Sequence, residues 1–298
     1  MKIKSLILGD TQIPGGKVIQ RFVGVRGKRD LHIAAQDMPL YRANGPVIFI
    51  SDAHLGVKRF KKSSHKRLHI FCDILEKNPK ASVVLGGDFL EYGFNKTKHL
   101  KQLMEHRKSK NPVEALWLQM ITILEQREVI LLGGNHDPHD WYKRSKWLEH
   151  TGWAIEKFVI LQVKEQRILL THGHDIYEEV DKMFFKGIRN IHYSLIKLAR
   201  MVENKLLKHF GSKYLEWSYG HMNHSVKEVI GDWKKAFAVD KVLMGHVHMP
   251  YADQEKHLYV SGVFTEFYRS YALVDSHGNI SIDSQIIKFN EYLEYQKA

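Results

Sequence analysis

The chain lacks the paired cysteines that stabilise many small secreted proteins, because Cys72 is its only cysteine. No intramolecular disulfide can form, which agrees with a reducing compartment. Leu68, Phe71 and Leu75 flank Cys72 at helical spacing. This pattern predicts that the thiol is buried on the apolar face of a helix and is not a nucleophile.

The sequence also lacks an apolar run of about 20 residues, the length that a helix needs to span a bilayer. Near the start, residues 6–8 form an apolar patch that is too short for the core of a signal peptide. No small-residue cleavage site follows this patch. These absences predict a cytoplasmic protein.

Acidic residues are outnumbered, since 33 Asp and Glu stand against 45 Lys and Arg and give a net charge of +12. This charge favours polyanionic partners, such as nucleic acid, an anionic membrane surface or a phosphorylated substrate. Hydrophobic residues make up 44% of the 298 residues and charged residues 26%, which is ordinary globular composition. The length predicts one large domain, or one domain with an insertion.

Five short apolar runs each lead into side chains that can bind a metal ion. The runs are residues 47–50, 82–85, 129–132, 167–170 and 241–244, and the side chains after them are Asp52, His54, Asp88, Asn135, His172, His246 and His248. Fully apolar runs of this length are typical of strands buried on both faces. Helical patterns at 65–77 and 113–126 lie between the early runs, so we predict a layered α/β fold. In such folds the strand ends face one crevice, where chemistry gathers.

The segments outside these motifs are assigned by pattern. Residues 1–45 are predicted to be an N-terminal extension of unknown role, with a short strand at 18–25. A hairpin, an interaction arm and a cover for a sheet edge remain open for it. Residues 46–298 form the main domain, and strands at 257–260, 270–274 and 279–282 are predicted to complete its fold.

Residues of about 176–236 have a helical pattern and are rich in aromatic and basic side chains. Examples are Met183, Phe184, Tyr193, Lys186 and Arg189. We predict a helical cap inserted into the core. The alternative is that its apolar stripe packs on the core and its charges are solvated.

The types of the seven side chains limit what they can bind. Carboxylate, amide and imidazole donors without thiolate suit Mn, Fe, Zn, Co or Ni, whereas calcium requires more oxygen ligands. Both Asp52-x-His54 and His246-x-His248 would direct two side chains to one side if the chain were extended. A lone Gly-Asp, His-x-His or Asn-His-Asp is more often a turn or a surface feature. Their joint occurrence, each after an apolar strand, favours a metal centre.

These motifs resemble the five signature blocks of the calcineurin-like metallophosphoesterases over roughly 46–274. The blocks are Asp52-x-His54, Gly87-Asp88, Gly134-Asn135-His136-Asp137, His172-Gly173 and Gly245-His246-Val247-His248. The resemblance implies a four-layer αββα sandwich with a dinuclear centre of divalent ions, with Mn preferred and Fe or Zn as alternatives. It implies that Asp52, His54 and His248 bind one ion and that Asn135, His172 and His246 bind the other. Asp88 would bridge the two ions.

The same resemblance implies a mechanism. A hydroxide that bridges the two ions would attack phosphorus in line, without a covalent enzyme intermediate. His136 would face the leaving oxygen as a general acid or electrostatic stabiliser, steadied by Asp137. His172 fits the ligand position at the strand end, which leaves His174 to support the site or face the substrate.

Within the superfamily, the chain most resembles the UDP-2,3-diacylglucosamine pyrophosphohydrolases of the lipid A pathway. The similarity rests on residues 51–55, on the insertion before the last histidine block, and on residues 262–266 with 270–274. It implies a nucleotide-linked lipid substrate and a cap in peripheral contact with the inner membrane face. The chain departs from these enzymes at His136, where they often carry Arg, and in its longer N-terminal segment.

Two further interpretations of the basic residues stay open. Lys58 and Arg59 begin a basic stretch that continues to Lys66 and Arg67, and this stretch either contacts a phosphate or is a solvated loop and helix start.

A metal-dependent nuclease is the alternative enzyme, although no nucleic-acid module or base-stacking stripe is recognisable, so nucleic acid is the less favoured partner. A non-catalytic scaffold is disfavoured, because all seven ligand positions and His136 are filled.

Overall fold

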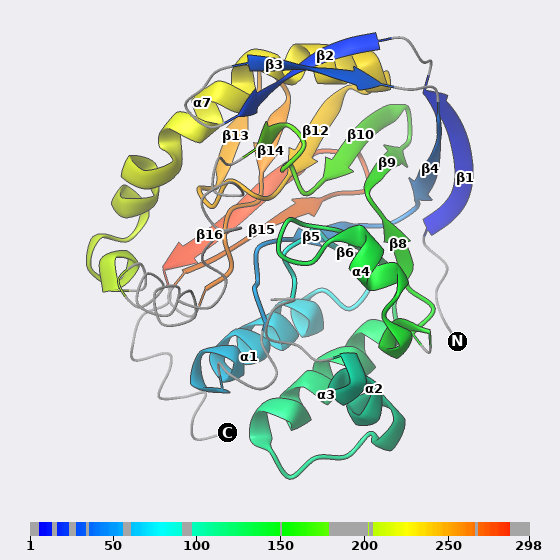
Figure 1. Cartoon of the computed structure of the whole chain (residues 1–298), viewed down its shortest axis with the longest axis vertical. Coiled ribbons are helices and arrows are strands. Elements are labelled where there is room, and N and C mark those ends of the chain that lie inside the picture. The colour runs from blue at the N-terminus through cyan, green and yellow to red at the C-terminus, as the bar shows by residue number, and fades with distance from the viewer. Residues whose placement is uncertain are drawn as a thin grey trace, which may run out of the picture.

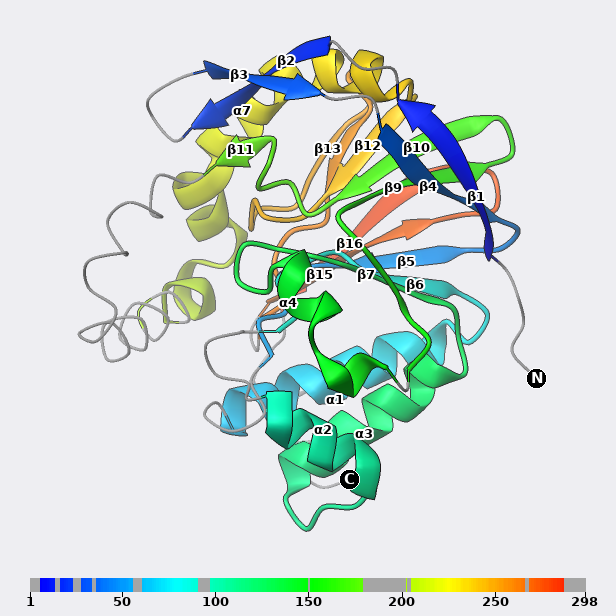
Figure 2. The same cartoon turned by 45° about the vertical axis from the view of Figure 1, so that its right-hand side comes forward.

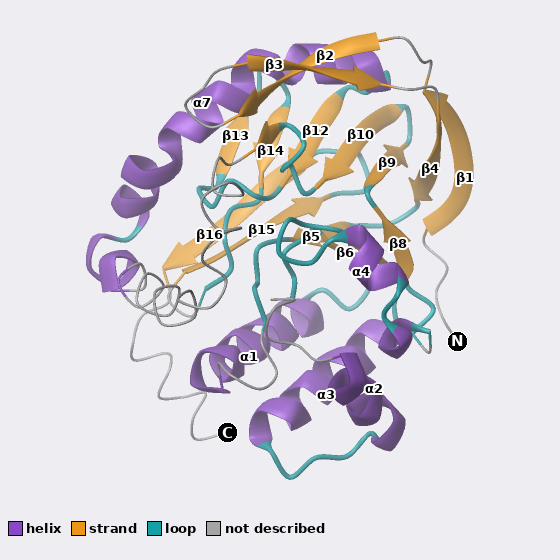
Figure 3. Ribbon diagram, viewed as in Figure 1, coloured by secondary structure: helices purple, strands orange, loops and turns teal. Residues whose placement is uncertain are grey.

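The computed structural model of the chain describes residues 6–13, 17–23, 28–33, 36–55, 61–90, 97–149, 151–178, 202, 205–265 and 268–286. Within these residues, two large β-sheets pack face to face and helices cover both outer faces (Figure 1). The same four layers can be followed by secondary structure in Figure 3. The predicted αββα sandwich is therefore confirmed.

The first sheet has six strands in the order β16-β15-β5-β6-β7-β8. Their bounds are β5 (Val47–Ile50), β6 (Ser82–Leu85), β7 (Val129–Leu132), β8 (Ala154–Glu156), β15 (Tyr268–Val274) and β16 (Ile280–Ile286). Strands β5 to β8 are parallel neighbours, so their carboxyl ends meet at one edge of the sheet. β15 and β16 continue the sheet as antiparallel strands.

The second sheet has seven strands in the order β1-β4-β9-β10-β12-β14-β13. Their bounds are β1 (Leu6–Ile13), β4 (Gln36–Ala43), β9 (Phe158–Val163), β10 (Gln166–Thr171), β12 (Lys241–Met244), β13 (Tyr251–Asp253) and β14 (Leu258–Val260). β10, β12 and β14 are parallel neighbours. The two histidine blocks that follow β10 and β12 therefore leave the sheet at the same edge.

Helices α1 (Lys61–Lys77), α2 (Thr97–His106) and α3 (Pro112–Glu125) cover the first sheet, and α7 (Ser212–Phe237) covers the second (Figure 2). Two shorter elements, α4 (His139–Lys143) and the 3-10 helix η3 (Lys146–Leu148), follow β7. α3 begins at a sequence-encoded cap, because the Asn111 side chain accepts a hydrogen bond from the Val113 amide and Pro112 fills the first helical position. The helices predicted at 65–77 and 113–126 are confirmed as α1 and α3.

Alternation along the strands explains the layers. In β5, Val47 and Phe49 point into the apolar layer between the sheets, whereas Ile48 and Ile50 point toward the helices. β10 divides in the same way, since Leu170 lies between the sheets and Leu169 faces α7. A continuous apolar run therefore encodes a strand that is buried on both faces, as predicted.

The N-terminal residues are structurally part of the sandwich. β4 pairs with β9 and β1 pairs with β4, so both strands extend the second sheet. β2 (Lys17–Val23) and β3 (Lys28–Ile33) form a hairpin that joins β11 (Tyr177–Glu178) in a small third sheet beside α7 (Figure 2). Trp233 Nε1 donates a 2.9 Å hydrogen bond to the Gln20 carbonyl, which ties α7 to this hairpin. The N-terminal residues therefore contribute a hairpin and two strands at one edge of the second sheet.

The segment predicted as a cap needs a correction over its second half. α7 lies within it, and Val226, Ile230 and Trp233 pack on the second sheet as the fourth layer of the sandwich. Residues 179–201 and 203–204 lie outside the described residues, and so do the cap side chains Met183 and Lys186. Among the helices that the structure describes, none combines the length and apolar character needed to cross a bilayer.

Candidate metal centre

The seven predicted ligands follow strands of both sheets. Asp52 and His54 follow β5, Asp88 follows β6, Asn135 follows β7, His172 follows β10, and His246 and His248 follow β12. The loops after β5 and β6 stay paired beyond the strands, because the Asp52 amide donates to the Gly87 carbonyl at 3.0 Å and the His54 amide to the Asp88 carbonyl at 2.8 Å. This pairing places the first two blocks side by side.

Four of the ligands have a left-handed backbone. The φ angles are 54° at Asp52, 45° at His54, 50° at Asp88 and 66° at His246. Residues other than glycine seldom adopt this region, and such strain concentrates at functional sites. The expectation that Asp52 and His54 converge because the chain is extended is therefore wrong in its geometry. The chain turns sharply at both residues, and this turn directs their side chains inward.

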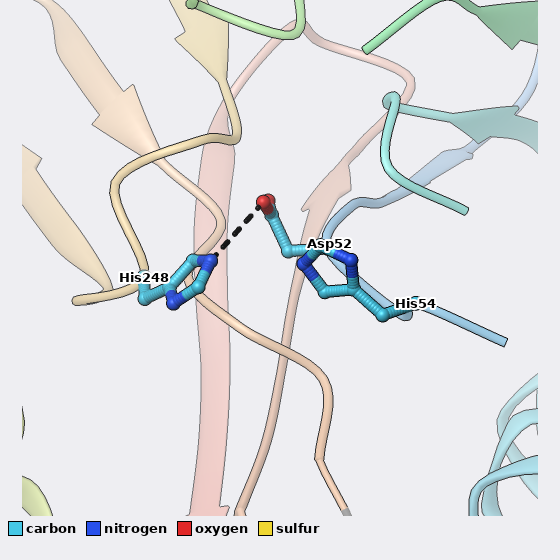
Figure 4. Close-up of side chains that lie close together, drawn as sticks. All are labelled: Asp52, His54 and His248. Atoms are coloured by element: carbon cyan, nitrogen blue, oxygen red, sulfur yellow. Dashed lines mark ion pairs between the residues drawn. The ribbon is translucent and has the colours of Figure 1, made fainter. Parts of the chain in front are cut away.

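Asp52, His54 and His248 form the first group of donors. Their ligand atoms all lie within 4.8 Å of one another (Figure 4). Nε2 of His248 is 3.6 Å from Oδ1 of Asp52. That separation is too long for a good hydrogen bond. It is close to the ~3.4 Å expected between two donors that bind one tetrahedral ion with bonds of about 2.0–2.2 Å.

Asp88 lies between the first group and a second one. Its Oδ2 is 3.9 Å from Nε2 of His54 and 3.4 Å from Nε2 of His172. On the far side, Nε2 of His172 is 3.0 Å from Oδ1 of Asn135, and the ring of His172 is 5.1 Å from that of His246. Asp88 therefore lies between the two groups, and its role as a bridging ligand stays a prediction.

Backbone groups fix the orientation of these side chains. Nδ1 of His172 is 3.0 Å from the Gly86 carbonyl, which leaves Nε2 for an ion. The His246 amide donates to Oδ2 of Asp52 at 2.9 Å and so joins the two sheets at the site. At Gly87, φ is +86° and a Cβ would lie 2.6 Å from the His172 ring, so a side chain would displace that ligand.

Asp137 is fully buried and organises the loops. Its Oδ1 accepts hydrogen bonds from the amides of Asp88 and Gly134 at 2.8 and 2.9 Å. Its Oδ2 accepts from the Leu90 amide at 2.8 Å and from the Tyr142 hydroxyl. Through these contacts Asp137 positions the loop that carries Asp88. Its predicted support of the His136 ring stays a prediction.

His136 is exposed at the edge of the site. Its backbone amide donates to Oδ1 of Asp88 at 2.8 Å, and its ring lies 4.8 Å from the ring of His54. His54, Asp88 and His136 also form a group of donors close enough to bind an ion. The geometry is therefore compatible with two roles for His136, a ligand and a group that faces the leaving oxygen.

The residues predicted to contact substrate have different outcomes. Lys58 and Arg59 lie outside the described residues. His174 is half-buried, with its ring 5.4 Å from His172. Arg67, at the end of the basic stretch, fits neither interpretation, because it is buried and donates to the Ala53 carbonyl at 2.8 Å, beneath the first ligand loop. Its position on the apolar stripe of α1, four residues before Phe71, was the signal in the sequence.

Burial and neighbouring charges shift the pKa values of four groups at the site. Burial alone would raise the pKa of Asp52, but the nearby charges of His172 and His248 hold it at about 2. Burial opposes ionisation of Asp88 too, yet His172 above all places its pKa well below the usual range. Burial would lower the pKa of His172, but Asp88 and Asp52 raise it to about 10. Burial and the Asp88 charge raise the pKa of Asp137 to about 8, against the bonds from Tyr142 and Leu90.

This charge pattern fits a cation. Two ionised carboxylates in the interior need positive charge beside them, which a divalent ion or a proton on His172 can supply. Oδ1 of Asp52 and Nε2 of His246 are buried and have no hydrogen-bond partner within the described parts of the chain. Such polar atoms are costly to bury unless something binds them. The oxygen and nitrogen donors suit a first-row divalent metal.

Comparison with known proteins agrees with this centre. The sequence profile of the family described as "Calcineurin-like phosphoesterase" matches residues 45–250. No curated protein matches the sequence.

Solved structures resemble the chain at low identity. TT1561 of Thermus thermophilus is 11% identical with a TM-score of 0.41, over 83% of this chain and 100% of that one. A cold-active protein tyrosine phosphatase is 13% identical with a TM-score of 0.36, over 82% and 80% of the two chains. A mutant of such a phosphatase is 12% identical with a TM-score of 0.39, over 91% and 99%. Likeness at this level carries no information on substrate.

Proposed function

The chain belongs to the calcineurin-like phosphoesterase family, and from that premise we propose that it hydrolyses a phosphodiester or pyrophosphate bond at a centre of two divalent ions. The observation that carries the proposal is the position of Asp88, whose Oδ2 lies 3.9 Å from His54 on one side and 3.4 Å from His172 on the other. A carboxylate between two groups of histidines is the arrangement that a shared ligand needs.

Each residue of the candidate metal centre has a role in this proposal. Asp52, His54 and His248 hold one ion, Asn135, His172 and His246 hold the other, and Asp88 contributes to both. Bound there, Mn²⁺ or a similar ion supplies an activated water and neutralises charge on the phosphate. The exposed ring of His136 donates a proton to the leaving oxygen. Asp137 keeps Asp88 in place.

For the substrate, we propose a nucleotide-linked lipid of the UDP-2,3-diacylglucosamine type. Support comes from the large apolar side chains that stay exposed at and before the start of α7, which are Val202, Phe210 and Trp217, exposed by 45%, 55% and 80%. Lys205, Lys208 and Lys213 are exposed in the same stretch. Apolar and basic side chains together suit peripheral contact with an anionic membrane, where such a substrate resides.

A hydrolysis panel tests the proposal. Wild type and Asp88→Ala are assayed with Mn²⁺ on UDP-2,3-diacylglucosamine, bis-p-nitrophenyl phosphate, cyclic nucleotides, and single- and double-stranded DNA. Asp232→Ala, at an exposed position of α7, is the matched control. Turnover of the lipid nucleotide alone, lost only in Asp88→Ala, supports the whole proposal.

The other outcomes separate its parts. Turnover of generic diesters without the lipid nucleotide keeps the metal hydrolase and removes the lipid substrate. Salt-sensitive cleavage of DNA favours a nuclease, the alternative that the net charge of +12 suits. Equal activity of Asp88→Ala and wild type on every substrate would contradict the proposed centre.

A further inference from the structure

Helix α7 contacts the loop that carries His248 at two consecutive turns. Oη of Tyr219 is 3.3 Å from Nδ1 of His248, and the two rings lie 5.0 Å apart. One turn later, Nδ2 of Asn223 donates a 3.3 Å hydrogen bond to the carbonyl of Met249, the next residue of the loop. Both contacts come from the outer layer of the sandwich; one ends at a proposed metal ligand and the other at the residue that follows it.

The orientation of the His248 ring explains how the contact with Tyr219 can affect metal binding. Nε2 of His248 faces the site, 3.6 Å from Oδ1 of Asp52, and Nδ1 faces Tyr219 (Figure 4 shows the Asp52 side). An imidazole that binds an ion through Nε2 carries its proton on Nδ1 and donates it. A hydroxyl oxygen placed there fixes both the tautomer and the ring orientation.

Asn223 is buried in a way that is costly for folding. It is 3% exposed, and its Oδ1 has no hydrogen-bond partner among the residues that the structure describes. A buried unsatisfied acceptor typically costs about 1–3 kcal/mol. An apolar residue of similar size would avoid this cost, so the useful part of Asn223 is the amide that holds the Met249 carbonyl.

We infer that Tyr219 and Asn223 are positioning residues that hold His248 for its ion, an inference that rests on the metal centre proposed above. Tyr219 and Met249 also pack against one apolar cluster, which contains Leu215, and this packing holds the helix beside the loop. His172 is oriented by the Gly86 carbonyl, which follows β6 of the other sheet, whereas Nδ1 of His248 contacts a side chain 29 residues away. The affinity for one ion therefore depends on how α7 packs against the loop that carries His248.

Two variants and a matched control test the inference. Tyr219→Phe removes the hydroxyl and keeps the ring, and Asn223→Leu removes the amide at similar volume. Tyr259→Phe is the control. It removes a hydroxyl that donates a 2.9 Å hydrogen bond to Oε1 of Gln254, which is not a proposed ligand. Each chelated protein is titrated with Mn²⁺ by calorimetry, and its melting temperature is measured without metal.

The inference predicts that one of two Mn²⁺ ions binds about 10- to 100-fold more weakly to Tyr219→Phe and Asn223→Leu, while Tyr259→Phe binds as wild type does. The metal-free melting temperature of Asn223→Leu should not fall. Unchanged Mn²⁺ affinity in both variants would overturn the inference and leave the metal centre intact. An equal loss of affinity in Tyr259→Phe would also overturn it. Failure of wild type to bind two ions would remove the proposed function itself.

Discussion

The carboxylate of Asp137 accepts a 2.8 Å hydrogen bond from the backbone amide of Asp88. Asp137 is fully buried, and this bond fixes Asp88 between the two groups of metal donors. The same oxygen accepts the Gly134 amide at 2.9 Å. One side chain thus joins the loops after β6 and β7. We therefore expect the position of Asp88 to depend on this contact.

Asp137→Asn should therefore weaken the site although the volume is unchanged. The amide nitrogen of Asn would face donors that now face an oxygen, which should cost about 1–3 kcal/mol of unfolding free energy and lower Mn²⁺ affinity. Urea unfolding and calorimetry measure the two effects. Tyr142→Phe is the comparison, because it removes one donor and keeps both carboxylate oxygens. Wild-type metal affinity in Asp137→Asn would contradict this role.

Gly87→Ala should disturb the ligand on the other sheet. The new Cβ would lie 2.6 Å from the His172 ring, at a φ of +86° that alanine disfavours. We expect a loss of stability of about 1–3 kcal/mol together with weaker Mn²⁺ binding. Gly231→Ala is the matched control: an added Cβ would meet nothing within 4 Å in α7, so this variant should gain about 0.5–1 kcal/mol. Thermal unfolding of both variants, with and without metal, decides the outcome.

His136→Ala separates the two roles that the geometry allows for this exposed ring. If His136 faces the leaving oxygen, kcat should fall about 10²- to 10⁴-fold while the metal content stays at the wild-type value. Loss of a bound ion in the variant would instead identify His136 as a ligand with His54 and Asp88. Metal analysis and steady-state kinetics on the same preparation give both numbers.

The loss of stability with rising pH should be smaller when metal is added. The folded pKa of His172 is about 10, above the unfolded value of about 6.5, so its contribution is complete below that unfolded value and is lost as pH rises toward 10. The raised pKa of Asp137, about 8, also lowers stability as pH rises from about 4 to 8. Chelated protein should therefore melt at a lower temperature at pH 9 than at pH 6.5.

Bound Mn²⁺ requires His172 without its proton, so metal should stabilise the protein more at the higher pH. Melting curves in chelator and in Mn²⁺, at several pH values, measure this difference. At the acid end, the Asp52 contribution should be lost in both conditions as pH falls from about 4 to the folded pKa of about 2. The same slope above pH 6.5 with and without metal would show that His172 is not a ligand.

The sequence predicted the strand ends correctly because that signal is local. Residues 47–50 and 129–132 are apolar throughout, and the polar donors follow directly. The backbone at Asp52 and His54 was not predictable in this way, since their turns depend on pairing with the carbonyls of Gly87 and Asp88. The spacing of residues predicts side-chain direction only where the backbone is a regular helix or strand. The loops that carry Asp52 and His54 are not regular.

Long-range contacts set the other limit. Tyr219 and His248 are 29 residues apart, and nothing in the local pattern of α7 marks its hydroxyl as different from those of other aromatic residues. The pairing of β4 with β9 likewise joins distant segments, so the place of the N-terminal strands could not be read from turn signals. Arg67 was detectable in principle, as a charge on an apolar stripe.

The most direct test of the metal centre is the number of ions bound per chain in wild type, Asp88→Ala and Asp232→Ala, together with hydrolysis of bis-p-nitrophenyl phosphate. We predict two divalent ions in wild type and in Asp232→Ala. In Asp88→Ala we predict the loss of at least one ion and a fall of hydrolysis to background, because Asp88 contributes to both groups of donors. Two ions and full hydrolysis in Asp88→Ala, or no bound metal in wild type, would contradict the account.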